Sequence, residues 1–398
     1  MNRRQLITLL VLALIACAAG LAVYKQNSST WQGGTSASGK VLGDFDLNNV
    51  ARVVITSSAS TATLAKKDNI WVVHERDDYP ANFTGVGNLI QELWQMKPVQ
   101  GVEVGASQLG RLELLPPGQE AGQTGTLIDL QDKDSKRIAA LMVGKDFFQQ
   151  SAQMPGDEGE PAGRYVMPAG ASLPQVSLVS ETLDDADPNP VAWLDTDFLK
   201  IDRIQSVALS SGTASWKLTR ATDTATDWTL ADAKPGEKVD STKVPSFAGV
   251  LGASTFIDVL PANAKRDVSG STVVITTFDN FTYTLGFGKA DGDKMPLTVA
   301  VAADLPKARV PGKDEKPDEK KKLDDAFASK SKRLDDTLAK AKGLEARVYL
   351  VAKSTFDPIF KSRSDFLVKP AAPSPSPASG APSVPVTVTT PPISAPGH

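Results

Sequence analysis

The sequence is poor in the residue types that build disulfides and most metal centres. Its 398 residues include one cysteine, Cys17, and two histidines, His74 and His398. One cysteine cannot form an intramolecular disulfide, and structural zinc sites use about four Cys or His ligands. Aromatic residues make up 6% of the chain and the net charge is -3, so the broad basic surface that nucleic-acid binding requires is absent. We expect no cofactor, no metal and no nucleic acid as a ligand.

The sequence also lacks a recognisable set of catalytic residues. There is no Gly-x-Ser-x-Gly motif, and Ser329 and Lys332 match the Ser-x-x-Lys pattern without its companion motifs. His74 lies on an expected strand with no positioned partner beside it, which favours a structural or surface role. The acidic residues between Glu181 and Asp187 do not have the spacing of a calcium-binding loop. We therefore interpret the chain as non-enzymatic.

One long apolar run is present, and it lies at the N-terminus. Residues 6–24 are almost all apolar, close to the roughly 20 residues that a helix needs to cross a bilayer. Arg3 and Arg4 precede the run, which predicts a cytoplasmic N-terminus and a periplasmic bulk at a bacterial inner membrane. Residues 1–24 are thus the expected stub and transmembrane anchor. The alternative is a lipoprotein lipidated at Cys17, because the four residues that end there fit the loose cleavage pattern.

A stretch with one tryptophan and one helical segment occurs twice. Trp71 and Trp228 are 157 residues apart, and apolar residues at helical spacing follow each of them at a shift of 158. These apolar residues are Val86, Leu89, Leu93 and Val99 in the first copy, and Val244, Phe247, Leu251 and Ile257 in the second. The match predicts a tandem repeat in which each tryptophan lies under its own helix and anchors its own core.

The predicted fold class is α+β: an N-terminal transmembrane helix followed by two tandem repeats. Each repeat is expected to be an antiparallel sheet of hairpins covered by one amphipathic helix. Repeat one spans residues 41–200 and repeat two residues 201–369, after a flexible linker at residues 25–40 that is rich in Ser, Gly and Thr. Strands are expected at residues 52–56, 61–64, 69–74, 126–130, 137–143, 273–277 and 283–287, and the first helix at residues 85–97.

Further segments correspond between the two copies. Residues 141–145 align with residues 285–289, and both segments end in Gly-Lys. The other matched segments are residues 164–167 with 297–301, and residues 197–199 with 365–367 as the ends of the copies. Each match predicts the same element at the same place in both repeats.

Repeat two carries a charged insertion, residues 306–347, that repeat one lacks. It contains thirteen Lys or Arg and nine Asp or Glu residues. A narrow apolar stripe on its expected helix consists of Leu323, Phe327, Leu334 and Leu338. One interpretation is a solvated helix, because runs of charge usually face water. The other is a docking helix for a protein partner, because a lone apolar stripe needs a cover.

The C-terminal tail, residues 370–398, consists mainly of Pro, Ser, Ala, Val and Thr and holds no Asp, Glu, Lys or Arg. Such a composition buries too little apolar surface to offset the entropy of ordering the chain. The tail is therefore expected to be disordered.

The repeated features together resemble a known bacterial family. Asn-Arg-Arg precedes the single N-terminal span, and Gly-Lys pairs at Gly144-Lys145 and Gly288-Lys289 accompany the two tryptophan-containing strands. This pattern, over about residues 1–369, resembles the domain of unknown function 4340 (DUF4340) family. The resemblance implies a membrane-anchored envelope protein, often encoded near transporter components similar to those of gliding-motility systems, and implies no catalytic residues. The insertion and the tail depart from the family's pattern.

We therefore expect a membrane-anchored periplasmic interaction or scaffold protein, accessory to an ABC-type transport or envelope complex. Its expected partners are the membrane, through the N-terminal span, and a protein of an inner-membrane complex; the transporter link is implied by the resemblance alone. One alternative is a ligand-binding module that holds a sugar, lipid or peptide between the repeats, because pockets favour domain interfaces. Another is an enzyme that uses two carboxylates about 5 to 9.5 Å apart in a cleft.

Overall fold

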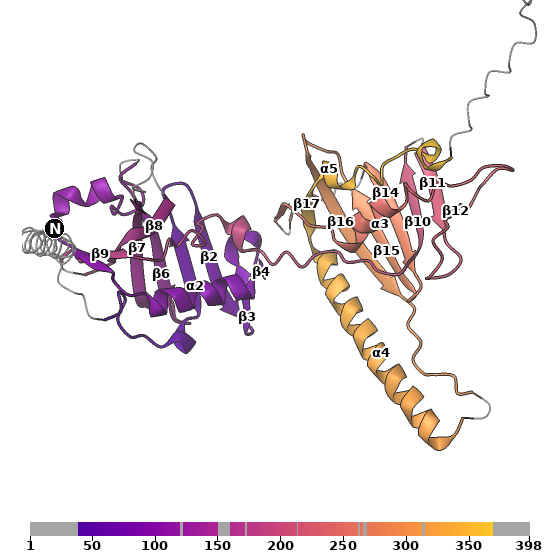
Figure 1. Ribbon diagram of the computed structural model, residues 1–398, viewed down its shortest axis with the longest axis horizontal. Coiled ribbons are helices and arrows are strands. Elements are labelled where there is room, and N and C mark those ends of the chain that lie inside the picture. Colours follow the sequence, from indigo (N-terminus) through magenta and orange to yellow (C-terminus); the bar gives the residue numbers. More distant parts are fainter. Residues whose placement is uncertain are drawn as a thin grey trace, which may run out of the picture.

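The computed structural model describes residues 39–119, 122–149, 160–171, 173–212, 214–261, 263–265, 269–312 and 315–368. These residues form two antiparallel sheets, one in each half of the chain (Figure 1). The predicted anchor at residues 1–24, almost all of the linker at 25–40 and the tail at 370–398 lie outside the described residues.

The first sheet contains nine strands in the order β4-β3-β2-β1-β6-β7-β8-β9-β5, and all neighbours are antiparallel. Its strands are β1 (Arg52–Thr56), β2 (Thr61–Lys67), β3 (Ile70–Val73), β4 (Tyr79–Pro80), β5 (Gln100–Val102), β6 (Thr126–Gln131), β7 (Arg137–Gln149), β8 (Glu160–Pro168) and β9 (Val176–Val179). Alternate residues of a strand face opposite sides of the sheet, and in β1 this places Val53 and Ile55 in the core.

The second sheet contains eight strands in the order β12-β11-β10-β14-β15-β16-β17-β13, again all antiparallel. Its strands are β10 (Ile204–Ser211), β11 (Ala214–Thr219), β12 (Thr229–Leu230), β13 (Asp258–Val259), β14 (Ser271–Thr277), β15 (Phe281–Phe287), β16 (Lys294–Ala303) and β17 (Val348–Ala352). Apart from β4, each strand of the first sheet has a counterpart at the same place in this order. A duplicated sequence produces such a shared order.

The register of the strands also agrees between the two sheets. In the first sheet Val53 lies between Leu64 on β2 and Leu130 on β6. The matching set in the second sheet is Val207 on β10, Leu218 on β11 and Ile275 on β14. Because the same positions face each other in both sheets, residues of one repeat can be compared with residues of the other one by one.

Helices are few in the described residues. They are α2 (Phe83–Gln95), α3 (Pro245–Gly252), α4 (Pro317–Gly343) and α5 (Lys353–Phe356). Short 3-10 helices are η1 (Leu47–Asn49), η2 (His74–Arg76), η3 (Ala106–Leu112), η4 (Pro190–Trp193), η5 (Leu344–Ala346) and η6 (Arg363–Phe366). Helix α2 lies across one face of the first sheet (Figure 1). It begins after Asn82, whose side chain accepts a hydrogen bond from the Gly85 amide as an N-cap.

The prediction of an α+β fold is wrong, because the described residues are mostly antiparallel sheet with few helices. The covering helices are short, 13 residues in α2 and 8 in α3. The sheets are larger than expected because short segments such as β5, β13 and β17 lack a clear alternating pattern but still pair at sheet edges. Among the described residues no helix is long and apolar enough to cross a membrane, and residues 6–24 lie outside them.

The predicted match between the ends of the repeats is also wrong. The backbone carbonyls of Trp193 and Phe366 accept hydrogen bonds from the amides of Asn82 and Asp240, which are 158 residues apart and lie before the covering helices. Leu194, which follows Trp193, forms an antiparallel β-bridge with Ala81. Leu367, which follows Phe366, forms the equivalent bridge with Val239. Trp193 therefore corresponds to Phe366, five residues before the Phe198 that the Asp-Phe-Leu pattern indicated.

Candidate functional site

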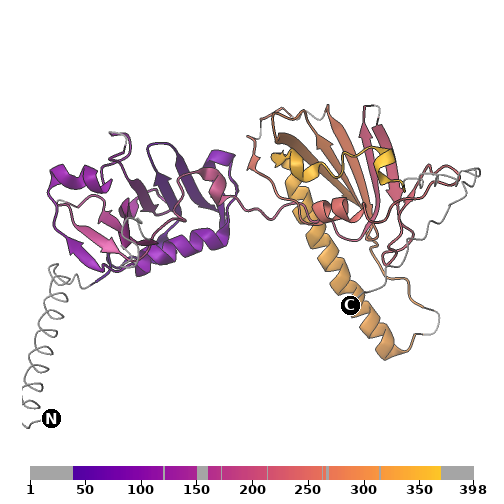
Figure 2. The same ribbon diagram turned by 45° about the horizontal axis from the view of Figure 1, so that its top comes forward.

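Insertion residues form a projecting arm on the second repeat. Helix α4 runs for 27 residues and extends away from both sheets (Figures 1 and 2). Near its C-terminal end Ala341 is buried, and Leu334 and Leu338 pack against the core of the sheet. Toward its N-terminal end Leu323 remains 41% exposed. The helix is therefore anchored at one end and open to solvent at the other.

A groove of about 380 Å³ lies between α4, the β14–β15 turn and the segment of chain that precedes α4. Phe327 and Leu334 line it from the helix, and Leu305 and Pro306 line it from the other side. Next to the groove Val310 is 89% exposed, beside the open part of the helix. Two members of the predicted docking stripe thus line a concave surface, a third is exposed beside it, and the fourth, Leu338, packs against the sheet.

Arg309 links the segment that precedes α4, here called the return segment, to the helix. Arg309 donates hydrogen bonds to Glu315 and, through Nε at 2.8 Å, to Asp324 on α4. The Gly312 amide donates to Glu315 as well, at 2.6 Å. The Arg309 guanidinium, followed by this amide, lowers the pKa of Glu315 to about 2, so the clamp stays charged at every physiological pH. The return segment is therefore held against α4.

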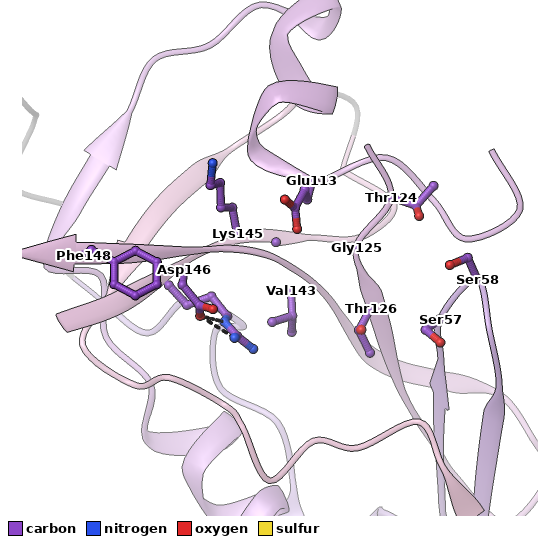
Figure 3. Close-up of a pocket in the computed structure, with 12 residues that line it drawn as sticks. Ser57, Ser58, Glu113, Thr124, Gly125, Thr126, Val143, Lys145, Asp146 and Phe148 are labelled. Carbon is purple, nitrogen blue, oxygen red and sulfur yellow. Dashed lines mark hydrogen bonds and ion pairs between the residues drawn. The ribbon is translucent and has the colours of Figure 1, made fainter. Parts of the chain in front are cut away.

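A second pocket, of about 340 Å³, lies at the open end of the β6–β7 hairpin of repeat one, away from the turn that joins the two strands (Figure 3). Lys145 and Glu113 project to one side of β7, whereas Asp146 lies on the other side (Figure 3). Arg164 is occupied, because its Nε donates to Asp146 at 2.6 Å and its Nη2 lies 3.3 Å from Asp184. The complete lining is Ser57, Ser58, Glu113, Thr124, Gly125, Thr126, Val143, Gly144, Lys145, Asp146, Phe148 and Arg164.

This pocket offers polar contacts but no nucleophile paired with a base. The Ser57 hydroxyl accepts hydrogen bonds from the amides of Ala59 at 3.1 Å and Ser60 at 3.2 Å, so it stabilises the β1–β2 turn. A catalytic serine needs a positioned base within hydrogen-bond reach, and none of the lining residues is a histidine. The pocket can hold a polar group.

Sites for metal ions are likewise absent from the part of the chain that the structure describes. Two of the acidic residues after β9 bind other groups of the protein. Asp184 pairs with Arg164, and Asp187 accepts a hydrogen bond from the Asn189 amide at 2.7 Å. His74 is exposed and lies 3.3 Å from Asp78.

Aromatic side chains fill the junction between the repeats. Tyr79 of β4 contacts Phe256 and Tyr349 of repeat two edge-on, with ring centroids 5.8 and 6.2 Å apart. Phe198, from the segment that joins the repeats, lies 5.2 Å from Phe256 and 4.6 Å from Tyr349. Burial raises the pKa of Tyr79 to about 12. The ligand site expected between the repeats in the alternative interpretation is occupied by these rings.

Ion pairs flank the aromatic junction. Arg76 of η2 donates to both carboxylate oxygens of Asp258 on β13, at 2.6 and 3.0 Å. Arg347, which follows η5, lies 3.9 Å from the Asp77 carboxylate. A bidentate arginine–carboxylate pair fixes orientation as well as distance. The two repeats therefore meet in a defined way.

The predicted core residues are placed unequally in the two repeats. Trp71, Val86, Leu89 and Leu93 are all buried in repeat one. In repeat two Val244 and Leu251 are buried, Trp228 is half-buried, and the side chain of Phe247 lies outside what the structure describes. The two tryptophans thus do not have the same environment.

Comparison with protein families gives one match. Residues 71–269, half of the chain, match the model described as Domain of unknown function (DUF4340). The chain belongs to the DUF4340 family. No curated protein matches the sequence significantly. The DUF4340 match runs from β3 to the residues just before β14, so it contains Tyr79, Phe198 and Phe256 of the junction but neither Tyr349 nor the arm.

Reasoning from sequence missed the residues of the junction and of the arm clamp. Tyr79, Phe198, Phe256 and Tyr349 are isolated aromatic residues in four separate segments, and no local pattern brings them together. Arg309 is one of many charged residues of the insertion. Only the chain topology places these side chains beside their partners.

Proposed function

We propose that this DUF4340 protein is a non-enzymatic interaction or scaffold protein of the bacterial envelope, accessory to an ABC-type transport or envelope complex. The observation that carries the proposal is the arm: a preformed, partly apolar groove lies beside a helix whose N-terminal end projects away from the sheet (Figure 1). An apolar stripe beside a groove is a common mode of recognising a partner segment. The groove accepts an apolar segment of a protein partner in the inner membrane.

Attachment to the membrane is supported by the sequence. Residues 6–24 form the apolar run, and Arg3 and Arg4 precede it, so the N-terminus lies in the cytoplasm and the bulk in the periplasm. Lipidation of Cys17 is the alternative form of attachment and leaves the bulk in the same compartment. Either way the arm is held near proteins of the inner membrane.

The arm gives a direct test by photo-crosslinking in intact membranes. Benzoylphenylalanine in place of Phe327 keeps an aromatic ring in the groove and should produce a discrete adduct with one membrane protein. The matched control is the same amino acid in place of Ala328, the next residue, which is exposed. Identical adduct patterns at the two positions would overturn the proposal.

A second variant separates docking from folding. Phe327→Asp places a charge in the groove and should abolish recovery of the partner, while the junction and both sheets keep their contacts. Deletion of the whole insertion is a poorer test, because Glu345 accepts from the Val301 amide at 2.7 Å and Arg347 binds the junction. Partner recovery unchanged by Phe327→Asp would contradict a role for the groove.

A further inference from the structure

Repeat two contains a pocket where repeat one is filled. It lies between α3 and the start of β10 and has a volume of about 530 Å³. Trp228, Val244 and Ala248 form its apolar wall, and Thr226 and Ser241 lie at its exposed rim. Trp228 is half-buried there, in contrast to the buried Trp71 of repeat one.

Small residues on α3 explain the hollow. The shift of 158 that relates the two covering helices places Ala248 at the position of Ile90 and Gly252 at the position of Trp94. In repeat one Ile90 is buried, and the Trp94 indole donates a hydrogen bond to the Phe45 carbonyl at 3.1 Å. Exchange of Ile and Trp for Ala and Gly removes most of the side-chain volume that would fill this layer.

The structure supports this residue-by-residue comparison on both sides of the helices. Before the helices, Ala81 and Val239 form the equivalent bridges, 158 residues apart. After them, Gln100 on β5 pairs with Leu178 on β9. Asp258 on β13, which is 158 residues after Gln100, pairs with Leu350 on β17. No insertion therefore separates the two helices from their matched flanks.

The two arginines that line the pocket are paired with carboxylates. Arg220 lies over the Trp228 ring at 5.5 Å from its centroid, donates to the Ile204 carbonyl at 2.6 Å and pairs with Asp223. Arg203 pairs with Asp223 at 2.7 Å and with Asp279. An uncharged ligand can thus occupy the apolar wall without separating either arginine from its carboxylate.

The described chain ends beside this pocket. The Val368 amide donates to the Lys238 carbonyl at 3.0 Å, and Lys238 is three residues before Ser241 at the pocket rim. Three residues span at most about 11 Å. The next residues of the chain, 370–398, are 29 residues with nine prolines and no Asp, Glu, Lys or Arg.

We propose that the Trp228 pocket binds an extended proline-rich peptide, and that its occupant is the Pro-Ser-Pro-Ser-Pro segment of this chain, residues 373–377. Proline-rich segments adopt a preformed extended helix and dock on aromatic-lined grooves at low entropic cost. At about 3.1 Å per residue, the tail reaches the pocket from Val368 with residues to spare. The inference is independent of the arm and its partner.

Engineered cysteines test the proposal in the full chain. In a Cys17→Ser background, Ser376→Cys is combined with Thr226→Cys at the pocket rim, and disulfide formation is followed under mild oxidation. The control combines Ser376→Cys with Ala233→Cys, an exposed position near the exit of the tail but outside the pocket lining. We expect the Thr226 pair to close at least fivefold faster than the Ala233 pair, as a monomer.

A variant that fills the pocket gives the second part of the test. Ala248→Ile restores the residue found in repeat one and should reduce the Thr226 rate to that of the control. Excess synthetic peptide of residues 370–382 should do the same in the unfilled chain, which keeps the test valid if Ala248→Ile fails to fold. Equal rates at the two positions, a rate insensitive to peptide, or a dimer-sized adduct would each overturn the proposal.

Discussion

Gly125 and Gly144 lie where backbone segments of repeat one approach each other closely. A Cβ on Gly144 would lie 2.3 Å from the Leu112 carbonyl oxygen, and one on Gly125 would lie 2.4 Å from the Val143 carbonyl oxygen. Repeat two has the same device, because a Cβ on Gly270 would lie 2.7 Å from the Phe287 carbonyl oxygen. Close packing of backbone on backbone thus explains the glycine that precedes β6 in repeat one and β14 in repeat two, and Gly144 of the first Gly-Lys pair.

The first prediction concerns Gly144→Ala. The added methyl group has no space against a carbonyl oxygen, so the free energy of unfolding should fall by about 2 kcal/mol or more. Gly87→Ala is the matched control, since Gly87 lies in α2 and a Cβ there would have nothing within 4 Å; alanine there should stabilise the helix by about 0.5–1 kcal/mol. Urea unfolding of both variants measures the two changes in the free energy of unfolding, which should have opposite signs. Equal changes in the two variants would contradict close packing at Gly144.

A second prediction at this scale concerns Glu92 of α2. Partial burial, followed by the negative charges of Glu181, Asp185 and Asp184, raises the pKa of Glu92 above its ordinary value. A raised pKa in the folded state means that the charged form costs stability above that pKa, and that the cost vanishes as pH falls below the ordinary pKa. Glu92→Gln should therefore raise Tm at neutral pH and leave it unchanged near pH 3. A lower Tm at neutral pH would contradict this assignment.

Single residues were predicted well where one pattern determines their place. The helical spacing of Val86, Leu89 and Leu93 predicted a buried face, and all three are buried. Each tryptophan is predicted to lie under its own helix and anchor its own core; Trp228 packs against the core but is only half-buried, because it lies beside the small residues Ala248 and Gly252. The comparison of the two copies already contained that signal.

Helix α4 is stabilised differently along its length. Its C-terminal end packs on the sheet, while its outer end depends on Arg309 and the ion pair between Lys320 and Asp324 at 2.8 Å. Exposed ion pairs on a helix contribute little, typically below about 1 kcal/mol each. The outer end is therefore the part of the second repeat most open to local unfolding.

The prediction that follows is for Arg309→Met. Loss of the clamp should leave Glu315 and Asp324 without their shared partner and free the return segment from the helix. Hydrogen–deuterium exchange should then accelerate in the outer half of α4, while exchange in β16 stays as it was. Lys321→Met serves as the control, because Lys321 is exposed. Equal acceleration in both variants would show that Arg309 is not the clamp.

Elements with strong periodicity were predicted closely, and weak ones were not. The strand expected at residues 52–56 is β1, and the helix expected at residues 85–97 is α2, which begins two residues earlier. The fold class failed because β5, β13 and β17 owe their conformation to partners far away in sequence. The number of strands in a sheet depends on contacts between distant segments, which a local sequence pattern does not predict.

The two repeats meet through a small set of aromatic and ionic contacts. Tyr79 and Arg76 come from an edge of the first sheet, and Phe256 and Asp258 come from an edge of the second. The contacts of Phe198 and Tyr349 explain why the end of repeat one could not be assigned from its Asp-Phe-Leu pattern, since Phe198 packs into the junction. A coupled junction predicts that the two repeats unfold together.

Tyr79→Ala tests that coupling. Removal of the ring should leave a cavity at the junction, costing roughly 3–5 kcal/mol, and should split one calorimetric transition into two. Tyr283→Ala is the matched control: Tyr283 is buried within the second sheet, stacked on Phe281. That variant should lower Tm without a gain in the number of transitions. A single transition for Tyr79→Ala would show that coupling between the repeats does not depend on Tyr79.

Docking of a protein partner in the arm groove is best tested by photo-crosslinking in native membranes with benzoylphenylalanine at Phe327. We expect one discrete adduct with an inner-membrane protein, absent from the Ala328 control and lost when Leu323→Asp is added. Adducts that are the same at both positions, or that survive Leu323→Asp unchanged, would contradict it.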